Sequence, residues 1–238
     1  MKKLVFENEK AAGEYAAAAI KDVLQEKKDA VFCLAAGHSS LPVFSAIQEA
    51  GLDFSEARFI ELDEWMDVPA AAEGSCTWFL NTHLFSKVNA RPENIYMFDN
   101  TAPDLQAECS RMESKIEELG GIDYLLLGMG MNGHLALNEP GDSFENGVHV
   151  IELAPKTLEV AQKYFAAGMP AITGGLTLGI KNLLAARKIQ LSVFGKHKHD
   201  VVCRLLSGQT PNEAFSASAL YQAEGVELLL DKAAESGI

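Results

Sequence analysis

The sequence predicts an α/β fold: a doubly wound, mostly parallel sheet with helices on both faces, that is, a Rossmann-like sandwich. Short runs that are apolar along their whole length alternate with stretches of helical periodicity about 10–15 residues long. Strands that are apolar on both sides are typical of a parallel sheet covered on both faces. Polar loops follow several of these runs, and in such a sheet they meet at the edge formed by the carboxyl ends of the strands.

The beginning of the chain shows this alternation most clearly. A helix is expected over residues 9–27, directly after the N-cap Asn8. The apolar run Ala30–Ala35 is then a short strand that ends in the polar turn Gly37-His38-Ser39-Ser40. Pro42 opens another helical pattern, so the order is strand, polar loop, helix.

The same unit recurs along the rest of the chain. Further strands are expected over residues 58–62, 95–98, 122–127, 148–153 and 189–194, and a helix over residues 105–119. The 238 residues are 48% hydrophobic, which is enough to bury a large core, so we expect one domain over residues 1–238.

Charge and cysteine usage exclude several classes of protein. The formal net charge of −13 repels phosphate backbones, and the short basic stretch Lys196–His199 is ended by Asp200, so no nucleic-acid partner is expected. The four cysteines stand far apart, which predicts reduced thiols rather than a disulfide framework or a zinc knuckle. No apolar run has the length of a secretory or membrane-spanning segment, so we expect a cytoplasmic protein without a membrane partner.

Two loops carry residue types suited to chemistry. Gly37, His38 and Ser39 lie between a buried strand and a helix, where free backbone N–H groups can bind a phosphate, although capping alone also favours Gly and Ser there. Asp63 and Glu64 follow the strand over residues 58–62, and this pair is either a solvated turn or a carboxylate placed for proton abstraction beside a carbonyl or imine. Asp63 is the better candidate for a base.

A glycine-rich stretch from Gly128 to Gly141 contains a third candidate, His134. Asn132 and Glu139 stand close enough in sequence to fix the tautomer of its imidazole and to share its proton. The loop holds no serine or cysteine nucleophile, which argues against a Ser-His-Asp hydrolase. Its GxGxxG pattern lacks an acidic residue at a strand end about twenty positions on, which argues against dinucleotide binding.

These segments together resemble the glucosamine-6-phosphate deaminase/isomerase family. The resemblance rests on Leu62-Asp63-Glu64-Trp65 and on a GxGxNGHxxxNEPG pattern that begins at Gly128, and it extends from about residue 30 to residue 200. The stretches around Trp65 to Cys76 and Gly175 to Gly179 are closer to the galactosamine-6-phosphate deaminase/isomerase branch. Related 6-phosphogluconolactonases share the glycine-histidine core but lack the Asn-Glu-Pro ending.

The resemblance implies a set of roles for the matching positions. Asp63 matches the proton-abstracting base, His134 the ring-opening acid/base, and Glu139 its carboxylate partner. Asn132 stands where many members have Asp. The phosphate loop matches Gly37, His38 and Ser39, with Ala36 in place of the usual Thr, and Lys198 matches a phosphate-binding lysine. A second basic phosphate ligand falls loosely on Lys163.

The implied activity converts a 2-amino-2-deoxyhexose 6-phosphate into a ketohexose 6-phosphate and ammonia by proton transfers, with no cofactor and no metal. His197, His199 and Asp200 on one helical turn offer too few spaced ligands for a metal site. A lactonase-like hydrolase and a non-catalytic sugar-phosphate sensor remain as alternatives. The sequence decides neither the configuration at C4 of the sugar nor the oligomeric state, and a homo-oligomer is compatible with it.

Overall fold

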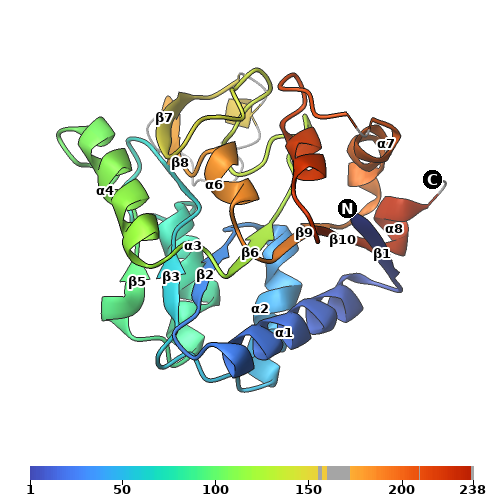
Figure 1. The fold of residues 1–238 in the computed structure, drawn as a ribbon, viewed down its shortest axis with the longest axis horizontal. Coiled ribbons are helices and arrows are strands. Elements are labelled where there is room, and N and C mark those ends of the chain that lie inside the picture. Colours follow the sequence, from blue (N-terminus) through green and yellow to red (C-terminus); the bar gives the residue numbers. More distant parts are fainter. Residues whose placement is uncertain (155–156, 160–171, 209, 237–238) are drawn as a thin grey trace.

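A computed structural model describes residues 1–154, 157–159, 172–208 and 210–236 (Figure 1). Seven strands of this part form a parallel sheet in the order β1-β10-β9-β6-β2-β3-β5. Their bounds are β1 Lys2–Phe6, β2 Val31–Leu34, β3 Arg58–Ile60, β5 Ile95–Tyr96, β6 Tyr124–Leu127, β9 Ile189–Val193 and β10 Glu227–Asp231. The expected doubly wound α/β fold is therefore confirmed.

Helices cover both faces of this sheet. One face carries α1 (Glu9–Glu26), α2 (Leu41–Glu49) and α3 (Cys76–His83), and the other carries α4 (Leu105–Glu118), α6 (Ile180–Leu184), α7 (His199–Ser207) and α8 (Lys232–Glu235). Figure 1 shows α1 and α2 side by side below the sheet, with α4 and α6 on the opposite side. Because the inner strands β2 and β6 are buried on both faces, they contain no polar side chain that points to solvent.

A second, three-stranded antiparallel sheet lies beside the main one. It consists of β4 (Asp63–Trp65), β8 (Gly174–Thr177) and β7 (His149–Glu152), with β8 in the centre. Residues 63–65 were expected to be a loop, and residues 148–153 a strand of the parallel sheet; both expectations are wrong. The two acidic residues of β4 favour a loop, but pairing with β8 holds them in a strand. β7 is only partly buried, which fits a strand of the smaller outer sheet.

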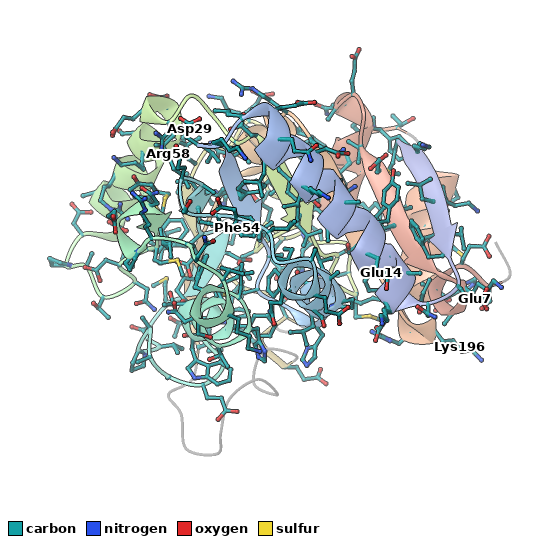
Figure 2. The ribbon with its side chains drawn as sticks, turned by 90° about the horizontal axis from the view of Figure 1, so that it is seen from below. Glu7, Glu14, Asp29, Phe54, Arg58 and Lys196 are labelled. Atoms are coloured by element: carbon teal, nitrogen blue, oxygen red, sulfur yellow. The ribbon has the colours of Figure 1, made fainter. Side chains whose placement is uncertain are left out.

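The two edges of the parallel sheet differ in chemistry. At its amino edge, Nη1 of Arg58 lies 3.1 Å from Oδ2 of Asp29, and Figure 2 shows the two side chains together. Near them, Phe54 packs edge-on against Phe32 with ring centroids 5.7 Å apart. An ion pair thus lies at the amino ends of the strands, whereas the polar loops that contain the candidate site residues lie at the carboxyl ends.

Candidate active site

The carboxyl ends of the parallel strands open into a cleft of about 1090 Å³. Its lining includes seven of the residues that the sequence singled out, namely Gly37, His38, Ser39, Asp63, Asn132, His134 and Lys198. Glu139 lies behind the wall, where it contacts Asn132. Lys163 lies outside the described residues. Segments far apart in the chain therefore converge on one cleft, as the strand topology predicted.

The candidate phosphate loop sits where α2 approaches the cleft. Residues His38–Ser40 form one turn of 3₁₀ helix that runs directly into α2, so the loop is followed by a helix N-terminus with Pro42 in its first turn. The loop also touches the glycine-rich stretch, because a Cβ atom at Gly128 would lie 3.0 Å from Oγ of Ser39. Small residues on both sides leave room for an anion near the helix start.

Lys198 reaches the cleft from the end of β9. Its Nζ atom donates a hydrogen bond to the carbonyl oxygen of Met129 at 2.6 Å, and burial lowers the pKa of its ammonium group. The preceding turn begins at Gly195, which has φ of +87° and donates its N–H to Oδ1 of Asp231 at 3.0 Å. The turn is therefore tied to the neighbouring strand β10, which fixes the direction in which Lys198 approaches.

Asp63 is a buried carboxyl that faces the cleft with 8% of its surface exposed. Burial raises its pKa, the charge of Glu64 adds to the rise, and the Cys76 thiol opposes it, so that the pKa is about 7. The Sγ atom of Cys76 lies 3.7 Å from Oδ1 of Asp63. A carboxyl with this pKa exchanges its proton readily near neutral pH, as a general base requires.

Glu64 points away from the cleft and is held by the start of α3. Its Oε1 atom accepts the N–H groups of Trp65 at 2.8 Å and Cys76 at 2.9 Å, and its Oε2 atom accepts the N–H of Thr77 at 2.9 Å. Cys76 and Thr77 are the first two residues of α3, so their N–H groups have no partner within the helix. Burial raises the pKa of Glu64, and the three N–H donors oppose that rise by stabilising its anion.

The imidazole of His134 packs onto the backbone of its own loop. A Cβ atom at Gly130 would lie 2.3 Å from the imidazole ring, so any residue other than glycine at this position would clash with the ring. Oδ1 of Asn132 accepts the His134 N–H at 3.2 Å, and Nδ2 of Asn132 donates to Oε2 of Glu139 at 2.7 Å. The same Glu139 oxygen lies 4.0 Å from Nδ1 of His134. The three residues therefore form one group, as their spacing predicted.

Burial sets the protonation of this imidazole. It lowers the pKa of His134, the charge of Glu139 opposes the change, and Lys198 adds to it. His134 is thus a neutral imidazole at neutral pH, able to accept a proton on one nitrogen while the other donates.

Hydrogen bonds on the side away from the cleft hold Asn138 and Glu139 in place. The Glu139 N–H donates to Oδ2 of Asp142 at 2.7 Å, and Oε1 of Glu139 accepts the N–H of Ala154 at 3.3 Å. Nδ2 of Asn138 donates to the carbonyl oxygens of Leu135 at 2.9 Å and Leu178 at 2.8 Å. The Asn-Glu-Pro segment is therefore tied to the end of β8, which explains the need for its first two residue types.

Sequence reasoning missed the contribution of α3. Cys76 and Thr77 anchor Glu64, and the Cys76 thiol touches Asp63. The available signal was Ser75, whose hydroxyl accepts the N–H of Trp78 at 2.9 Å and so marks a helix start. Ser75 indicated that a helix starts there, but the sequence did not show that the first turn of this helix would contact Asp63 and Glu64.

The described residues contain no group of three or more His, Cys, Asp or Glu side chains that could hold a metal ion. Among these same residues, no helix is both long and apolar enough to cross a membrane.

Fold and cleft together define a doubly wound α/β protein whose candidate site joins a glycine- and serine-containing loop at a helix start to two buried titratable side chains, Asp63 and His134. The sequence pattern of one family, described as glucosamine-6-phosphate isomerases/6-phosphogluconolactonase, matches residues 7–229, and the chain belongs to that family. It is 36% identical over 228 residues to glucosamine-6-phosphate deaminase of Bacillus velezensis, which covers 94% of each chain. It is 34% identical to glucosamine-6-phosphate deaminase 1 of Bacillus subtilis, over 94% of this chain and 93% of the relative.

Solved structures agree with this assignment. One, described as a monomeric glucosamine-6-phosphate deaminase, superimposes with a TM-score of 0.94 at 33% identity over 99% of both chains. The 6-phosphogluconolactonase of Trypanosoma brucei superimposes with a TM-score of 0.77 at 21% identity, over 100% of this chain and 98% of its own. At that identity the lactonase shares the fold, and its activity does not transfer.

Proposed function

We propose that this chain is an amino-sugar-phosphate deaminase/isomerase, which converts a 2-amino-2-deoxyhexose 6-phosphate to a ketohexose 6-phosphate and ammonia. The observation that carries the proposal is the placing of Asp63, with a pKa of about 7, and neutral His134 in one cleft with a phosphate loop. The deaminase relatives, at 33–36% identity over most of the chain, support the same activity.

Binding begins with the phosphate. In our proposal the backbone N–H groups around Gly37, His38 and Ser39 and the ammonium group of Lys198 hold it, which lays the sugar across the strand ends. Lys198 already donates to the carbonyl of Met129, so its ammonium group is positioned before substrate arrives. The binding energy of the phosphate thereby orients the reacting carbons toward Asp63 and His134.

Ring opening and proton transfer follow. His134, oriented by Asn132 and Glu139, takes the proton of the C1 hydroxyl and returns one to the ring oxygen, which gives the open aldehyde. Asp63 then removes the C2 proton while the C1 oxygen takes up a proton from solvent, which gives an enolamine. Asp63 delivers its proton to C1, which leaves an iminium at C2 and a hydroxyl at C1. Water adds to C2 and ammonia leaves, so the products are the 2-ketose phosphate and ammonia. Every step is a proton transfer or an addition of water, so this route calls for neither a cofactor nor a metal.

A lactonase-like hydrolase is the second candidate, because its structures share this fold. Such an enzyme would use His134 to activate water and would leave Asp63 without a task. The raised pKa of Asp63 and the buried Asn138-Glu139 pair favour the deaminase instead. We also propose that the protein works in the cytoplasm, in keeping with its four free cysteines.

The decisive experiment supplies glucosamine 6-phosphate and galactosamine 6-phosphate separately, and measures ammonia and ketose phosphate from each. Release of both products in equal amounts from either sugar supports the proposal, and the ratio of kcat/KM values identifies the configuration preferred at C4. Hydrolysis of 6-phosphogluconolactone without ammonia release from either amino sugar would identify a lactonase. Binding of a sugar phosphate without turnover of any of these compounds would identify a sensor.

A further inference from the structure

A thiol in the wall of the cleft contacts the candidate base. Cys76 is the first residue of α3, lines the cleft and is 5% exposed. Its Sγ atom lies 3.7 Å from Oδ1 of Asp63, which is within hydrogen-bonding reach of the large sulfur atom, and its backbone N–H donates to Oε1 of Glu64 at 2.9 Å. Cys76 therefore contacts both acids of β4, one through its side chain and the other through its backbone.

The backbone is held on both sides of Cys76, which fixes the thiol. The hydroxyl of Ser75 accepts the N–H of Trp78 at 2.9 Å, so the residue before Cys76 is an anchored N-cap. On the other side, the N–H of Thr77 donates to Oε2 of Glu64 at 2.9 Å. A cysteine side chain has one torsion between heavy atoms, and this torsion takes one of three staggered values. With its backbone fixed, the Sγ atom therefore has few positions open to it.

This thiol is the only hydrogen-bond partner of the Asp63 carboxyl among the residues that the structure describes. The ordinary pKa of a cysteine thiol is about 8.5, so at neutral pH the thiol carries its proton and donates it, whereas a carboxylate can only accept. Oδ1 of Asp63 is thus engaged by sulfur. Oδ2 accepts no hydrogen bond from the described part of the chain.

We propose that Cys76 is a positioning residue for Asp63: its thiol donates to Oδ1, fixes the rotation of the carboxyl group and leaves Oδ2 to remove the C2 proton. The role in catalysis rests on the proposed function, in which Asp63 is the base; the hydrogen bond itself does not.

The titratable groups that face this contact keep the proton on sulfur. They are the acids Asp63 and Glu64 on β4, Glu61 just after β3, and the buried thiol of Cys33 on β2. Burial raises the pKa of the Cys76 thiol well above its ordinary value, and the charges of the three acids add to the rise. A reactive thiolate needs a cation or a free helix N-terminus beside it, and here the first N–H groups of α3 are already bound to Glu64.

A weak donor suits a base. Burial and the charge of Glu64 raise the pKa of Asp63 to about 7, and the Cys76 thiol opposes this rise without preventing it. The thiol therefore orients the carboxyl and leaves most of its basicity in place. A stronger donor in the same position would stabilise the carboxylate more and would make it a poorer base.

Two substitutions at Cys76 separate orientation from simple packing. Cys76→Ala removes the donor, so the pKa of Asp63 should rise further and the acidic limb of kcat/KM should move to higher pH. The value of kcat should fall roughly 2–10-fold, the size expected for loss of one weak hydrogen bond. Cys76→Ser supplies a hydroxyl donor, so its limb should lie at or below the pH of the wild-type limb, and most of the lost kcat should return.

The matched control is Cys109→Ala, which makes the same change at a buried cysteine of α4. It should leave both kcat and the acidic limb where the wild type has them. The phosphate of the substrate titrates equally in all these proteins, so it does not contribute to differences between them. A limb and a kcat in Cys76→Ala that both equal those of the wild type would overturn the positioning role.

Infrared spectroscopy of the S–H stretch tests the hydrogen bond itself. This stretch lies apart from the amide and carboxyl bands, and its frequency falls when the thiol donates to a carboxylate. The band that Cys76→Ala loses should move to lower frequency as the pH rises through about 7, and in Asp63→Asn it should not move. A band that stays in place in the wild type would show that the thiol does not donate to Asp63. If the wild type releases no ammonia from either amino sugar, the proposed function fails, and the S–H band still decides whether Cys76 donates to Asp63.

Discussion

The amide of Asn132 donates to Glu139: its Nδ2 atom lies 2.7 Å from Oε2 of that carboxylate. The same oxygen lies 4.0 Å from Nδ1 of His134, so Glu139 supplies the negative charge beside the imidazole while Asn132 supplies none. The lowering of the His134 pKa by burial is larger than the rise caused by the charge of Glu139, so the pKa of His134 is lowered. The neutral Asn132 is thus part of the reason that His134 is uncharged at neutral pH.

Replacing this amide by an acid should raise the pKa of His134. In Asn132→Asp the hydrogen bond to Glu139 becomes a contact between two acids, and added negative charge close to an imidazole favours its cation. The pKa is measured by NMR titration of the His134 ring protons. The matched control is Asn8→Asp, which makes the same change at the exposed N-cap of α1 and keeps that cap. An unchanged or lower pKa of His134 in Asn132→Asp would contradict this account.

Lys198→Gln should weaken substrate binding more than turnover. The change removes the ammonium group that lines the cleft, and a hydrogen bond to a charged group is worth about 1.5–3 kcal/mol, so KM should rise roughly 10–100-fold with a smaller effect on kcat. Lys196→Gln is the control: it removes the same charge two residues earlier, where Figure 2 shows the side chain at the outer surface. Equal KM values for Lys198→Gln and the wild type would remove Lys198 from the phosphate site.

Five of the seven strands of the main sheet were predicted, because they are apolar runs; β1 and the inner strand β10 were not predicted. Val31 to Leu34 and Tyr124 to Leu127 are buried at every position, and continuous burial appears in sequence as a continuous apolar run. The edge strand β1 and the short β4 lack that signature. β4 contains Asp63 and Glu64, whose burial depends on N–H donors 12 and 13 residues further along the chain, so no local pattern could indicate it.

The sequence predicted which residues would lie together at the candidate site, but not the pKa of Asp63 or the contacts that position Lys198. Strand topology alone brings Ser39, Asp63 and His134 to one edge of the sheet, and the structure places them in one cleft. The pKa of Asp63 depends on burial and on the charge of Glu64, and the position of Lys198 depends on a carbonyl 69 residues away. Spacing in the sequence contains no information about either.

The acidic limb of kcat/KM should be governed by Asp63. Because a base must be ionised to act, and burial together with Glu64 raises the pKa of Asp63 to about 7, kcat/KM should fall as the pH drops below that value. The phosphate of the substrate also titrates, near pH 6, so a variant is needed to assign the limb. Glu64→Gln removes the neighbouring charge and should move the limb to lower pH. An unmoved limb would assign it to the substrate.

The same pKa has a consequence for stability. The folded-state pKa of Asp63 is raised from 3.8 to about 7, so the stability that this carboxyl contributes is present below pH 3.8 and is lost as the pH rises through about 7. At pH 8 the folded protein holds a buried anion that Asp63→Asn removes. The variant should therefore exceed the wild type in free energy of unfolding by about 2–4 kcal/mol at pH 8, and by roughly two fifths of that near pH 5.

Urea denaturation at pH 5 and pH 8 measures this difference. Asp67→Asn, which changes an exposed Asp four residues along the chain, should show no comparable dependence on pH. A variant Asp63→Asn that is less stable than the wild type at pH 8 would mean that the carboxylate is stabilised in place, and that its pKa is not raised.

Asp63→Asn should abolish most of the turnover while it leaves binding in place. The amide keeps the size and polarity of the side chain but cannot accept the C2 proton, so kcat should fall by about 10²-fold or more, the range for loss of a general base. Sugar-phosphate binding should persist, because the phosphate contacts lie at Gly37 to Ser39 and Lys198. Asp67→Asn should turn over like the wild type.

In deuterated water the wild type should also place solvent deuterium at C1 of the ketose product, since the proton that Asp63 returns to C1 can first exchange with solvent. Mass spectrometry of the product and a coupled ammonia assay give both readouts. Ammonia release by Asp63→Asn at the wild-type rate would mean that another group removes the C2 proton, even though the fold and the family remain as described.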